Sequence, residues 1–581
     1  MREAVSFEGD GGARRAGLSL YAARARAWVP SLSECLAAVA SAFLLLLAFP
    51  DFDLWPLAWV ALAPLLWAVA RGGRARRSFV AGWLAGAVFF YASCRWLTYP
   101  MIHYAGIPAW LAHVLLAPAA LAGGFFAGLF AGGLARAAAR WGANALLLAP
   151  PLWVACEWAR LGVIGQLWNA VGYSQAFHPA LIQPARFGGV YAVSFLVVAT
   201  NACVAYALLR RGARGLLLAA SSLACVALAL FAAASTAAPS NEGEAGAVVV
   251  ALQPNVIPDF GRGAEEYDAL AARHFDLSAA ALRKIDEGAA VESLDFSSIK
   301  SVGAVGGGGG DKAASGEDCG CGFGGVSKTP RVVVWPESPM NFSHGRGAEF
   351  REQVARFVRD NRASLLFNSL EPTRGGGGFN AAVLVNEEGR VAAQYDKIRL
   401  MPFGEYVPLP RWVPGAGLVR GVVGDFTPGE RYTLMPLGGG QTGVRAGVFI
   451  CLESAYPFIT RRFAQEGADV LIEMTNDAYQ GDTAVLRQHL SNAVFRAVET
   501  GRTLLRVTNT GVSARVSPRG EVTGETGRFV EAVRAWEVSR SDGGQTFYVR
   551  FGDALAAACS LASLVAVGLT LRKRKAGSSG V

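Results

Sequence analysis

Three short segments of the sequence place a reactive side chain directly after a run of β-forming residues. Glu337 follows V-V-V-W-P, Lys397 follows Q-Y-D, and Cys451 follows G-V-F-I. Active sites of sheet-based folds collect at the carboxyl ends of strands, so we expect these side chains to lie together. A carboxylate can take a proton from a thiol, and an ammonium can stabilise the oxyanion formed when sulfur attacks a carbonyl. The three residues therefore predict acyl transfer, with Glu337 as general base, Lys397 as oxyanion stabiliser and Cys451 as nucleophile.

Each of these residues also has an ordinary interpretation when it is taken alone. Glu337 could be a loop carboxylate, Lys397 a solvated lysine, and Cys451 an inert core thiol. Their combination favours chemistry. A Cys-His dyad is harder to build, because the chain has only 6 histidines and His489 falls inside an expected helix.

The segments that must position these residues alternate between short β-forming runs and polar helices from residue 247 onward. This alternation is typical of sheets covered by helices. Two helices can be located by their apolar period, 347–362 and 483–499, and each is expected to lay one apolar stripe on a sheet.

The rest of the chain has the composition of a membrane protein. Of its 581 residues 52% are hydrophobic and only 17% are charged, which excludes an ordinary soluble protein. A helix of about 20 apolar residues crosses a bilayer. Eight stretches qualify, giving an α-helical transmembrane bundle of about eight spans beside an α/β domain. They are 32–49, 54–70, 79–97, 107–134, 143–159, 190–209, 216–238 and 554–571.

Basic residues alternate between the connections of these stretches, which predicts their orientation. Arginines fill the leader 1–31 and the connections near 71–77, 136–140 and 210–214, and the tail 572–581 is also basic. By the positive-inside rule these segments are cytoplasmic, so residues 239–552 face the periplasm of an inner-membrane protein. The net charge of +9 is then explained by cytoplasmic loops, and nucleic acid is not an expected partner.

The expected organisation is a leader, a membrane domain at 32–238, an outer catalytic domain at 239–552 and a last span at 553–571. Within the outer domain, 286–329 is glycine-rich and is expected to be a flexible insertion. Cys319 and Cys321 lie in it, and unstructured thiols are favoured over a metal site or a local disulfide. No zinc spacing occurs among the 9 cysteines, and a disulfide scaffold is excluded.

The combination of W-P-E at Glu337, Y-D-K at Lys397 before P-F-G-E, and I-C-L-E at Cys451 resembles the Glu-Lys-Cys triad of the nitrilase (carbon-nitrogen hydrolase) superfamily. With helices before and after it, the chain is similar to the apolipoprotein N-acyltransferase family, the membrane-embedded members of that superfamily. Further matches are L-Q-P-N, G-Y-S-Q and T-N-D-A, and the resemblance spans about 32–571. The chain departs from the pattern at Leu452 and Gln480, where aromatic residues are usual.

The resemblance implies an αββα sandwich domain and a two-step exchange without a cofactor or metal. Cys451 would take an acyl chain from a membrane phospholipid, and the α-amino group of a diacylglyceryl-cysteine lipoprotein would attack the resulting thioester. Glu405 and Glu453 are candidates for orienting Lys397, and Asn476 of the T-N-D-A segment is a third supporting candidate. Their ordinary interpretation is as structural polar residues.

Two segments are candidates for contact with lipid. The apolar, proline-rich loop 401–419 carries Phe403, Tyr406 and Trp412, which predicts a lid that dips into the membrane. The outer connection 167–175 contains Tyr173 and has two equal interpretations, an interfacial aromatic belt and the rim of a lipid entrance.

Two other functions remain open at this point. Water in place of the amine would make the chain a membrane-bound amidase, although a soluble substrate gives no reason for eight spans. A non-catalytic binding domain on a membrane bundle is the other alternative, and the complete Glu-Lys-Cys set argues against it.

Overall fold

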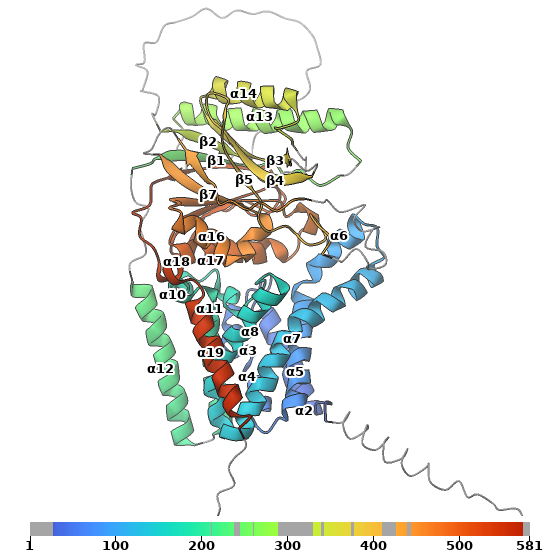
Figure 1. The fold of residues 1–581 in the computed structure, drawn as a ribbon, viewed down its shortest axis with the longest axis vertical. Coiled ribbons are helices and arrows are strands. Elements are labelled where there is room, and N and C mark those ends of the chain that lie inside the picture. The colour runs from blue at the N-terminus through green and yellow to red at the C-terminus, as the bar shows by residue number, and fades with distance from the viewer. Residues whose placement is uncertain are drawn as a thin grey trace, which may run out of the picture.

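The computed structural model describes residues 27–210, 212–236, 244–259, 261–288, 329–337, 342–373, 377–408, 426–438 and 443–572. A bundle of helices occupies one end of the molecule and a layered α/β part the other (Figure 1). The predicted insertion 286–329 is described only at 286–288 and 329, and Asp286 still belongs to a helix. Cys319, Cys321, the basic leader as far as residue 26, the basic tail from residue 573 and Trp412 lie outside the described residues.

The helical part contains α2 to α12 and the carboxyl-terminal α19. Ser31 begins α2 with a capping box, in which the Ser31 hydroxyl accepts from the backbone nitrogen of Glu34 and the Glu34 carboxylate accepts from the backbone nitrogen of Ser31. The main helices are α2 (Leu32–Leu47), α3 (Ala58–Ala61), α4 (Ala63–Ala70), α5 (Ala75–Ser93), α6 (Thr98–His103), α7 (Ala109–Trp141), α8 (Ala149–Ile164), α11 (Val190–Leu209), α12 (Ala213–Ser235) and α19 (Ala554–Leu569).

Helix lengths agree with a membrane location for this part of the chain. Among the described residues, three helical segments are long and apolar enough to span a bilayer: Ala109–Ile164, Val190–Leu209 and Gly215–Ser235. A bent pair, Ala75–Ser93 with Arg95–His103, qualifies as a fourth, with an angle of 55° at the break. The apolar helices Leu32–Leu47, Trp55–Ala70 and Ala554–Leu569 are shorter. The helical bundle is thus confirmed, while its division into eight spans stays a prediction.

Glycines bring α5 and α7 into close contact. A Cβ atom added at Gly86 would lie 2.7 Å from the Cα of Gly124, and one added at Gly124 would overlap the backbone nitrogen of Ala87. The glycines at positions 124, 128 and 132 face α5 at its residues 75–87. Their spacing of four residues therefore serves helix packing, as is common in membrane bundles.

The α/β part is a sandwich of two six-stranded mixed sheets. Their strand orders are β12-β1-β2-β3-β4-β5 and β11-β10-β9-β8-β7-β6. The first sheet has β1 (Ala247–Gln253), β2 (Arg331–Val334), β3 (Ser364–Pro372), β4 (Gly378–Val385), β5 (Val391–Asp396) and β12 (Ala532–Val538). The second has β6 (Leu434–Leu437), β7 (Val444–Ile450), β8 (Val470–Thr475), β9 (Thr503–Thr508), β10 (Ala514–Val516) and β11 (Val522–Thr523).

Helices cover both outer faces of the sandwich. Figure 1 shows α13 (Ala264–Asp286) and α14 (Ala348–Asn361) over the first sheet. It shows α16 (Pro457–Gln465) and α17 (Val485–Thr500) between the second sheet and the membrane helices. This arrangement of helix, sheet, sheet and helix confirms the predicted αββα sandwich.

Helix α17 is buried on all sides, which differs from the predicted single apolar stripe. Its buried residues include polar ones such as Gln488, Arg496 and Glu499. One face of α17 lies on the sheet, and the other contacts the helices of the bundle and the connections between them. Polar side chains of α17 therefore form hydrogen bonds across that boundary.

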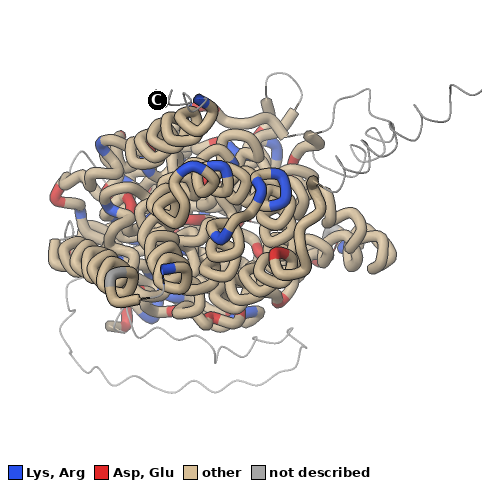
Figure 2. Tube along the Cα trace, turned by 90° about the horizontal axis from the view of Figure 1, so that it is seen from below, with Lys and Arg blue, Asp and Glu red and all other residues tan. Residues whose placement is uncertain are grey.

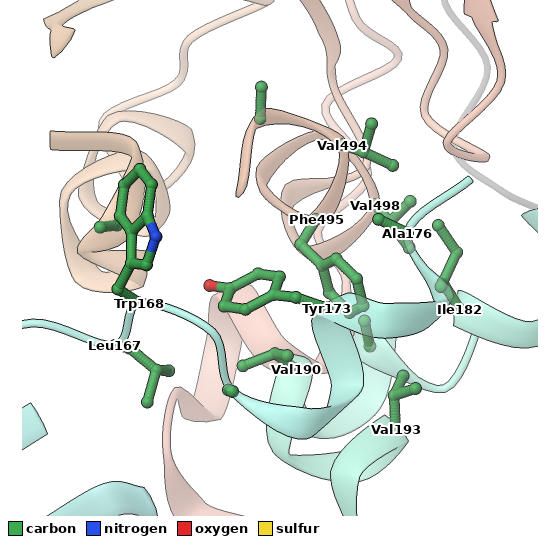
Figure 3. Packing of buried hydrophobic residues seen from close by; sticks show 14 of the residues in the cluster. Leu167, Trp168, Tyr173, Ala176, Ile182, Val190, Val193, Val494, Phe495 and Val498 are labelled. Atoms are coloured by element: carbon green, nitrogen blue, oxygen red, sulfur yellow. The ribbon is translucent and has the colours of Figure 1, made fainter. Parts of the chain in front are cut away.

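The connection between α8 and α11 forms much of this boundary. In Figure 3, Tyr173 lies beside Phe495 of α17, within the same buried cluster that contains Leu167, Trp168 and Val498. Tyr173 is buried, its ring centroid is 5.0 Å from that of Phe495, and its hydroxyl accepts a hydrogen bond from Arg496 at 3.2 Å. Tyr173 therefore occupies a packed contact between the two parts, and its place in a lipid entrance stays a prediction.

Candidate active site

The three predicted catalytic residues each follow the end of a strand near the middle of the sandwich. Glu337 comes shortly after β2, Lys397 directly after β5, and Cys451 directly after β7. Strands β2 and β7 are apolar runs buried on both faces, so each of these segments must turn where its polar residue appears. Strand β5 is an edge strand whose first residues are exposed. Two sheets contribute to the site, because β2 and β5 belong to one and β7 to the other.

Lys397 lies between two carboxylates. Its Nζ donates to Oε1 of Glu337 at 3.2 Å and to Oε1 of Glu405 at 3.0 Å, and the lysine side chain is buried. Burial opposes the charge, but the carboxylates of Glu337 and Glu405 outweigh it and raise the pKa of Lys397 well above its usual value. Lys397 is therefore a fixed cation, suited to stabilising negative charge rather than to taking up a proton.

Asn380 of β4 is a member of this cluster that the sequence did not reveal. Its Nδ2 donates to Oε1 of Glu337 at 3.0 Å and to Oε1 of Glu405 at 2.5 Å. Its Oδ1 accepts from Nδ2 of Asn368 at 2.6 Å, which fixes the orientation of the amide. An asparagine in a buried strand was the available signal, since buried amides require partners.

Cys451 begins the turn after β7 in a left-handed conformation, with φ of 54°. A residue with a side chain adopts this conformation only when its surroundings hold it there. Burial, together with the negative charge of Glu337, raises the pKa of the Cys451 thiol well above its usual value, and Lys397 opposes this shift only in part. The resting thiol is therefore neutral and needs a base before it can attack.

Glu453 connects the turn of Cys451 with the segment that follows Lys397. Its Oε1 accepts from the backbone nitrogens of Ile398 at 2.7 Å and Arg399 at 3.0 Å, and its Oε2 accepts from the nitrogen of Ile450 at 2.8 Å. The hydroxyl of Tyr395 donates to both oxygens. Burial raises the pKa of Glu453 to about 7 although these hydrogen bonds oppose the shift.

The two supporting glutamates thus occupy different positions. Glu405 pairs directly with Lys397 and also accepts from the backbone nitrogen of Met401 at 2.6 Å. Glu453 orients the segment of Lys397 through backbone amides. Asn476 lies beside Glu337, because its backbone nitrogen donates to Oε2 of Glu337 at 3.2 Å.

The predicted lid is described only at its start. Phe403 is exposed and has φ of 61°, and its backbone nitrogen donates to the carbonyl of Tyr406 at 2.8 Å. Tyr406 is partly buried. The segment is pinned to the site because Glu405 lies between these two aromatic residues and contacts Lys397.

This arrangement can perform acyl transfer in chemical terms. The thiol of Cys451 is neutral, and the carboxylate of Glu337 helps to raise its pKa. The buried ammonium of Lys397 pairs with the same carboxylate. Asn380 and the backbone of Asn476 hold the carboxylate in place. A base, a nucleophile and an oxyanion stabiliser are the components required.

Comparison with protein families gives two matches that follow one another along the chain. Residues 41–203 match the family described as apolipoprotein N-acyltransferase N-terminal domain, and residues 330–548 match carbon-nitrogen hydrolase. The second match covers most of the sandwich and contains Glu337, Lys397 and Cys451.

The similarity to individual proteins extends over most of the chain. An apolipoprotein N-acyltransferase of Geobacter metallireducens is 30% identical over 556 residues, which cover 93% of this chain and 96% of the relative. One of Allorhizobium ampelinum is 28% identical, covering 84% of this chain and 87% of the relative. Among solved structures, an amidase from Nesterenkonia sp. aligns with 52% of this chain and 94% of its own, at 18% identity and a TM-score of 0.32.

Proposed function

Because this chain belongs to the apolipoprotein N-acyltransferase family, we propose that it transfers an acyl chain from a membrane phospholipid to the α-amino group of a diacylglyceryl-cysteine lipoprotein. It is an N-acyltransferase of lipoprotein maturation, as its relatives are named. The identity of the donor and the acceptor, and the roles of individual residues, are the proposal.

In the first step Glu337 takes the proton of the Cys451 thiol, and the sulfur attacks the ester carbonyl of the phospholipid. The tetrahedral intermediate carries negative charge on the former carbonyl oxygen, next to the ammonium of Lys397. Collapse breaks the ester bond, and the proton on Glu337 passes to the leaving oxygen. The products are a thioester on Cys451 and a lysophospholipid.

In the second step the α-amine of the lipoprotein attacks the thioester carbonyl. Glu337 takes a proton from the attacking nitrogen, Lys397 again stabilises the oxyanion, and the C–S bond breaks. The thiolate of Cys451 recovers the proton from Glu337. The thioester keeps the energy of the donor ester, so neither step needs ATP.

One observation carries this assignment of roles. Lys397 is buried between Glu337 and Glu405, with its charge fixed, while the Cys451 thiol is held neutral by burial and by Glu337. A fixed cation beside a neutral thiol and a carboxylate base supports nucleophilic acyl transfer.

The proposed location is the inner membrane, with the α/β part in the periplasm. Figure 2 views the end of the molecule formed by the membrane helices and shows Lys and Arg gathered on it. At this end Arg136 donates to Thr570 Oγ1 at 3.2 Å and Arg140 to the carbonyl of Arg572 at 3.0 Å. A basic end opposite the α/β part supports the cytoplasmic assignment of that end.

A labelling experiment tests the proposal. The purified full-length protein is incubated in mixed micelles with a phospholipid carrying a labelled acyl chain, without an acceptor. We expect a hydroxylamine-labile label on the peptide that contains Cys451, and no label in Cys451→Ala or Glu337→Ala. Addition of a diacylglyceryl-cysteine peptide should move the label to its α-amine. Transfer of the label only to water would indicate an amidase, and a folded protein without any label would overturn the proposal.

A further inference from the structure

The main chain at Cys451 requires an external contact to hold it. A cysteine at φ of 54° is in a region that side chains disfavour, and the direction of its side chain depends on this turn. The carbonyl oxygen of Cys451 accepts a hydrogen bond from Nε2 of His489 at 3.1 Å. A residue of α17 therefore holds the peptide group of the nucleophile.

His489 is itself held by buried charges from two strands of the second sheet. Its Nδ1 lies 2.7 Å from Oδ1 of Asp477, and its Nε2 lies 3.1 Å from Oε1 of Glu473. Arg506 of β9 pairs with both carboxylates, at 2.6 Å in each case. The ring of Trp168 packs on the remaining side, with centroids 5.6 Å apart. These are the groups that face the imidazole.

The geometry requires a doubly protonated imidazole. A neutral ring has one N–H, and here one nitrogen faces the carboxylate of Asp477 while the other faces a carbonyl, both of which only accept. Burial opposes the charge, but chiefly Asp477, with help from Glu473, raises the pKa of His489 to about 9. Two carboxylates, one guanidinium and one imidazolium make this cluster neutral.

The residue next to His489 connects it to the membrane helices. Oε1 of Gln488 accepts from the indole nitrogens of Trp96 at 3.1 Å and Trp168 at 3.0 Å, and its Nε2 donates to the carbonyl of Ser93 at 3.0 Å. Longer contacts reach Asn169 at 3.5 Å and the carbonyl of Pro50 at 3.4 Å. Three outer connections of the bundle thus meet at one side chain of α17.

Two neighbouring residues therefore join parts of the molecule that are distant in the sequence. Gln488 bonds to the membrane helices, and His489 bonds to the nucleophile and to the charged cluster behind it. A shift of the helix ends near Trp96 or Trp168 would move Gln488, and His489 would move with it because both belong to one turn of α17.

We propose that His489 is a positioning residue that holds Cys451 in its reactive conformation. We propose further that Gln488 couples the position of His489 to the outer ends of the membrane helices. The inference rests on the proposed function, since it assigns residues that support the same thioester step. It predicts that acylation of Cys451 depends on two side chains that touch neither the acyl donor nor the reacting atoms.

Substitution of His489 tests the hold. In His489→Gln we expect kcat for thioester formation to fall by about tenfold or more while KM for the phospholipid changes less than about twofold, because the reacting geometry is lost and the lipid contacts are not. The single substitution leaves the cluster with an extra negative charge. The double variant Asp477→Asn/His489→Gln keeps it neutral and should show the same loss if it folds, which a thermal unfolding scan checks.

A matched control comes from the same helix. Glu499 is buried and accepts from the backbone nitrogen of Val190 at 2.9 Å and from Arg496 at 2.8 Å, so Glu499→Gln also changes a buried charge at the boundary. We expect kcat within about twofold of the unsubstituted protein. An equal loss in Glu499→Gln would mean that any disturbance of α17 has this effect, and would overturn the specific role of His489.

A double-mutant cycle tests the tie through Gln488. If Gln488 acts through His489, Gln488→Leu should slow thioester formation by roughly tenfold in the unsubstituted protein and by less than about twofold in His489→Gln. An equal fold decrease in both backgrounds would show that Gln488 acts independently of His489, and would contradict the proposed coupling.

Alkylation of Cys451 by iodoacetamide separates this inference from the proposed function. The reagent needs no lipid, so it reports the position of the thiol even if phospholipid is not the donor. We expect slower alkylation of Cys451 in His489→Gln than in Glu499→Gln, by about fivefold or more. Equal alkylation rates in the two variants would overturn the positioning role of His489, whatever the acyl donor proves to be.

Discussion

Oε1 of Glu453 accepts a hydrogen bond from the backbone nitrogen of Ile398 at 2.7 Å, which joins the turn that begins with the nucleophile to the residue after Lys397. The same carboxylate accepts from the backbone of Ile450, directly before Cys451. One side chain thereby fixes the distance between two segments that come from different sheets, and the relative position of thiol and ammonium follows from it.

Replacement of Glu453 should therefore reduce activity without removing any reacting group. In Glu453→Gln the amide NH₂ would face backbone N–H groups, so we expect thioester formation to fall by about 10- to 100-fold and the thermal midpoint to decrease. Glu466→Gln, at the exposed residue that follows α16, is the control and should leave both values unchanged. Normal activity in Glu453→Gln would contradict the bridging role.

Loss of the Lys397 ammonium should affect the chemical step most strongly. In Lys397→Met the oxyanion loses its cation, and we expect kcat to fall by about 100- to 1,000-fold with a small change in KM. Single-turnover labelling with phospholipid measures the chemical step. A higher KM for phospholipid with an unchanged kcat would contradict the assignment.

Asn380 should be required for a correctly placed base. In Asn380→Ala both Glu337 and Glu405 lose a hydrogen bond donor, so we expect kcat to decrease by about tenfold while lipid binding is retained. Asn368 offers a comparison, because Asn368→Ala leaves both hydrogen bonds of Asn380 to the glutamates in place and removes a group that orients Asn380, so it should have a weaker effect. A stronger effect at Asn368 than at Asn380 would argue for a purely structural network.

Tyr173 should behave as a contact between the two parts rather than as part of a lipid entrance. Tyr173→Phe keeps the ring on Phe495 and removes the hydroxyl that accepts from Arg496. We expect a thermal midpoint lower by roughly 2–4 °C and an unchanged KM for phospholipid. An increase in KM with an unchanged midpoint would favour the lipid entrance.

Stability should decrease at alkaline pH through His489. Its pKa is raised from 6.5 to about 9 in the folded protein, so its contribution is complete below about pH 6.5 and is lost as the pH rises through 9. Thermal scans of the full-length protein between pH 6.5 and 9.5 should show a falling midpoint, and Asp477→Asn/His489→Gln should show a smaller decrease over this interval. Parallel curves for the two proteins would contradict the assignment.

The sequence by itself determined the sandwich and the three residues at its strand ends. Strands β1, β7 and β9 are buried, largely apolar segments of strong β propensity, which is the pattern that predicts strands from sequence. Strand β5 is mostly not buried, and the run before Lys397 still predicts it. Glu337, Lys397 and Cys451 could be singled out because each follows such a run. Strand β11, with two residues, and strand β12 were not predicted, since a short run carries little pattern and pairing with a distant strand decides it.

Only the tertiary structure decided how the polar residues around the three are used. Nothing in the strand or helix pattern distinguishes Asn380, Tyr395 and His489. In the structure they bond to Glu337, Glu453 and Cys451 respectively, and the members of each pair are 38 to 58 residues apart in the sequence. The physical reason is that a buried polar group must be hydrogen-bonded, and the group it meets depends on which elements pack together. Helix α17 is the clearest case, because its sequence predicted one apolar face, whereas the membrane helices bury the other face as well and give Gln488 its partners.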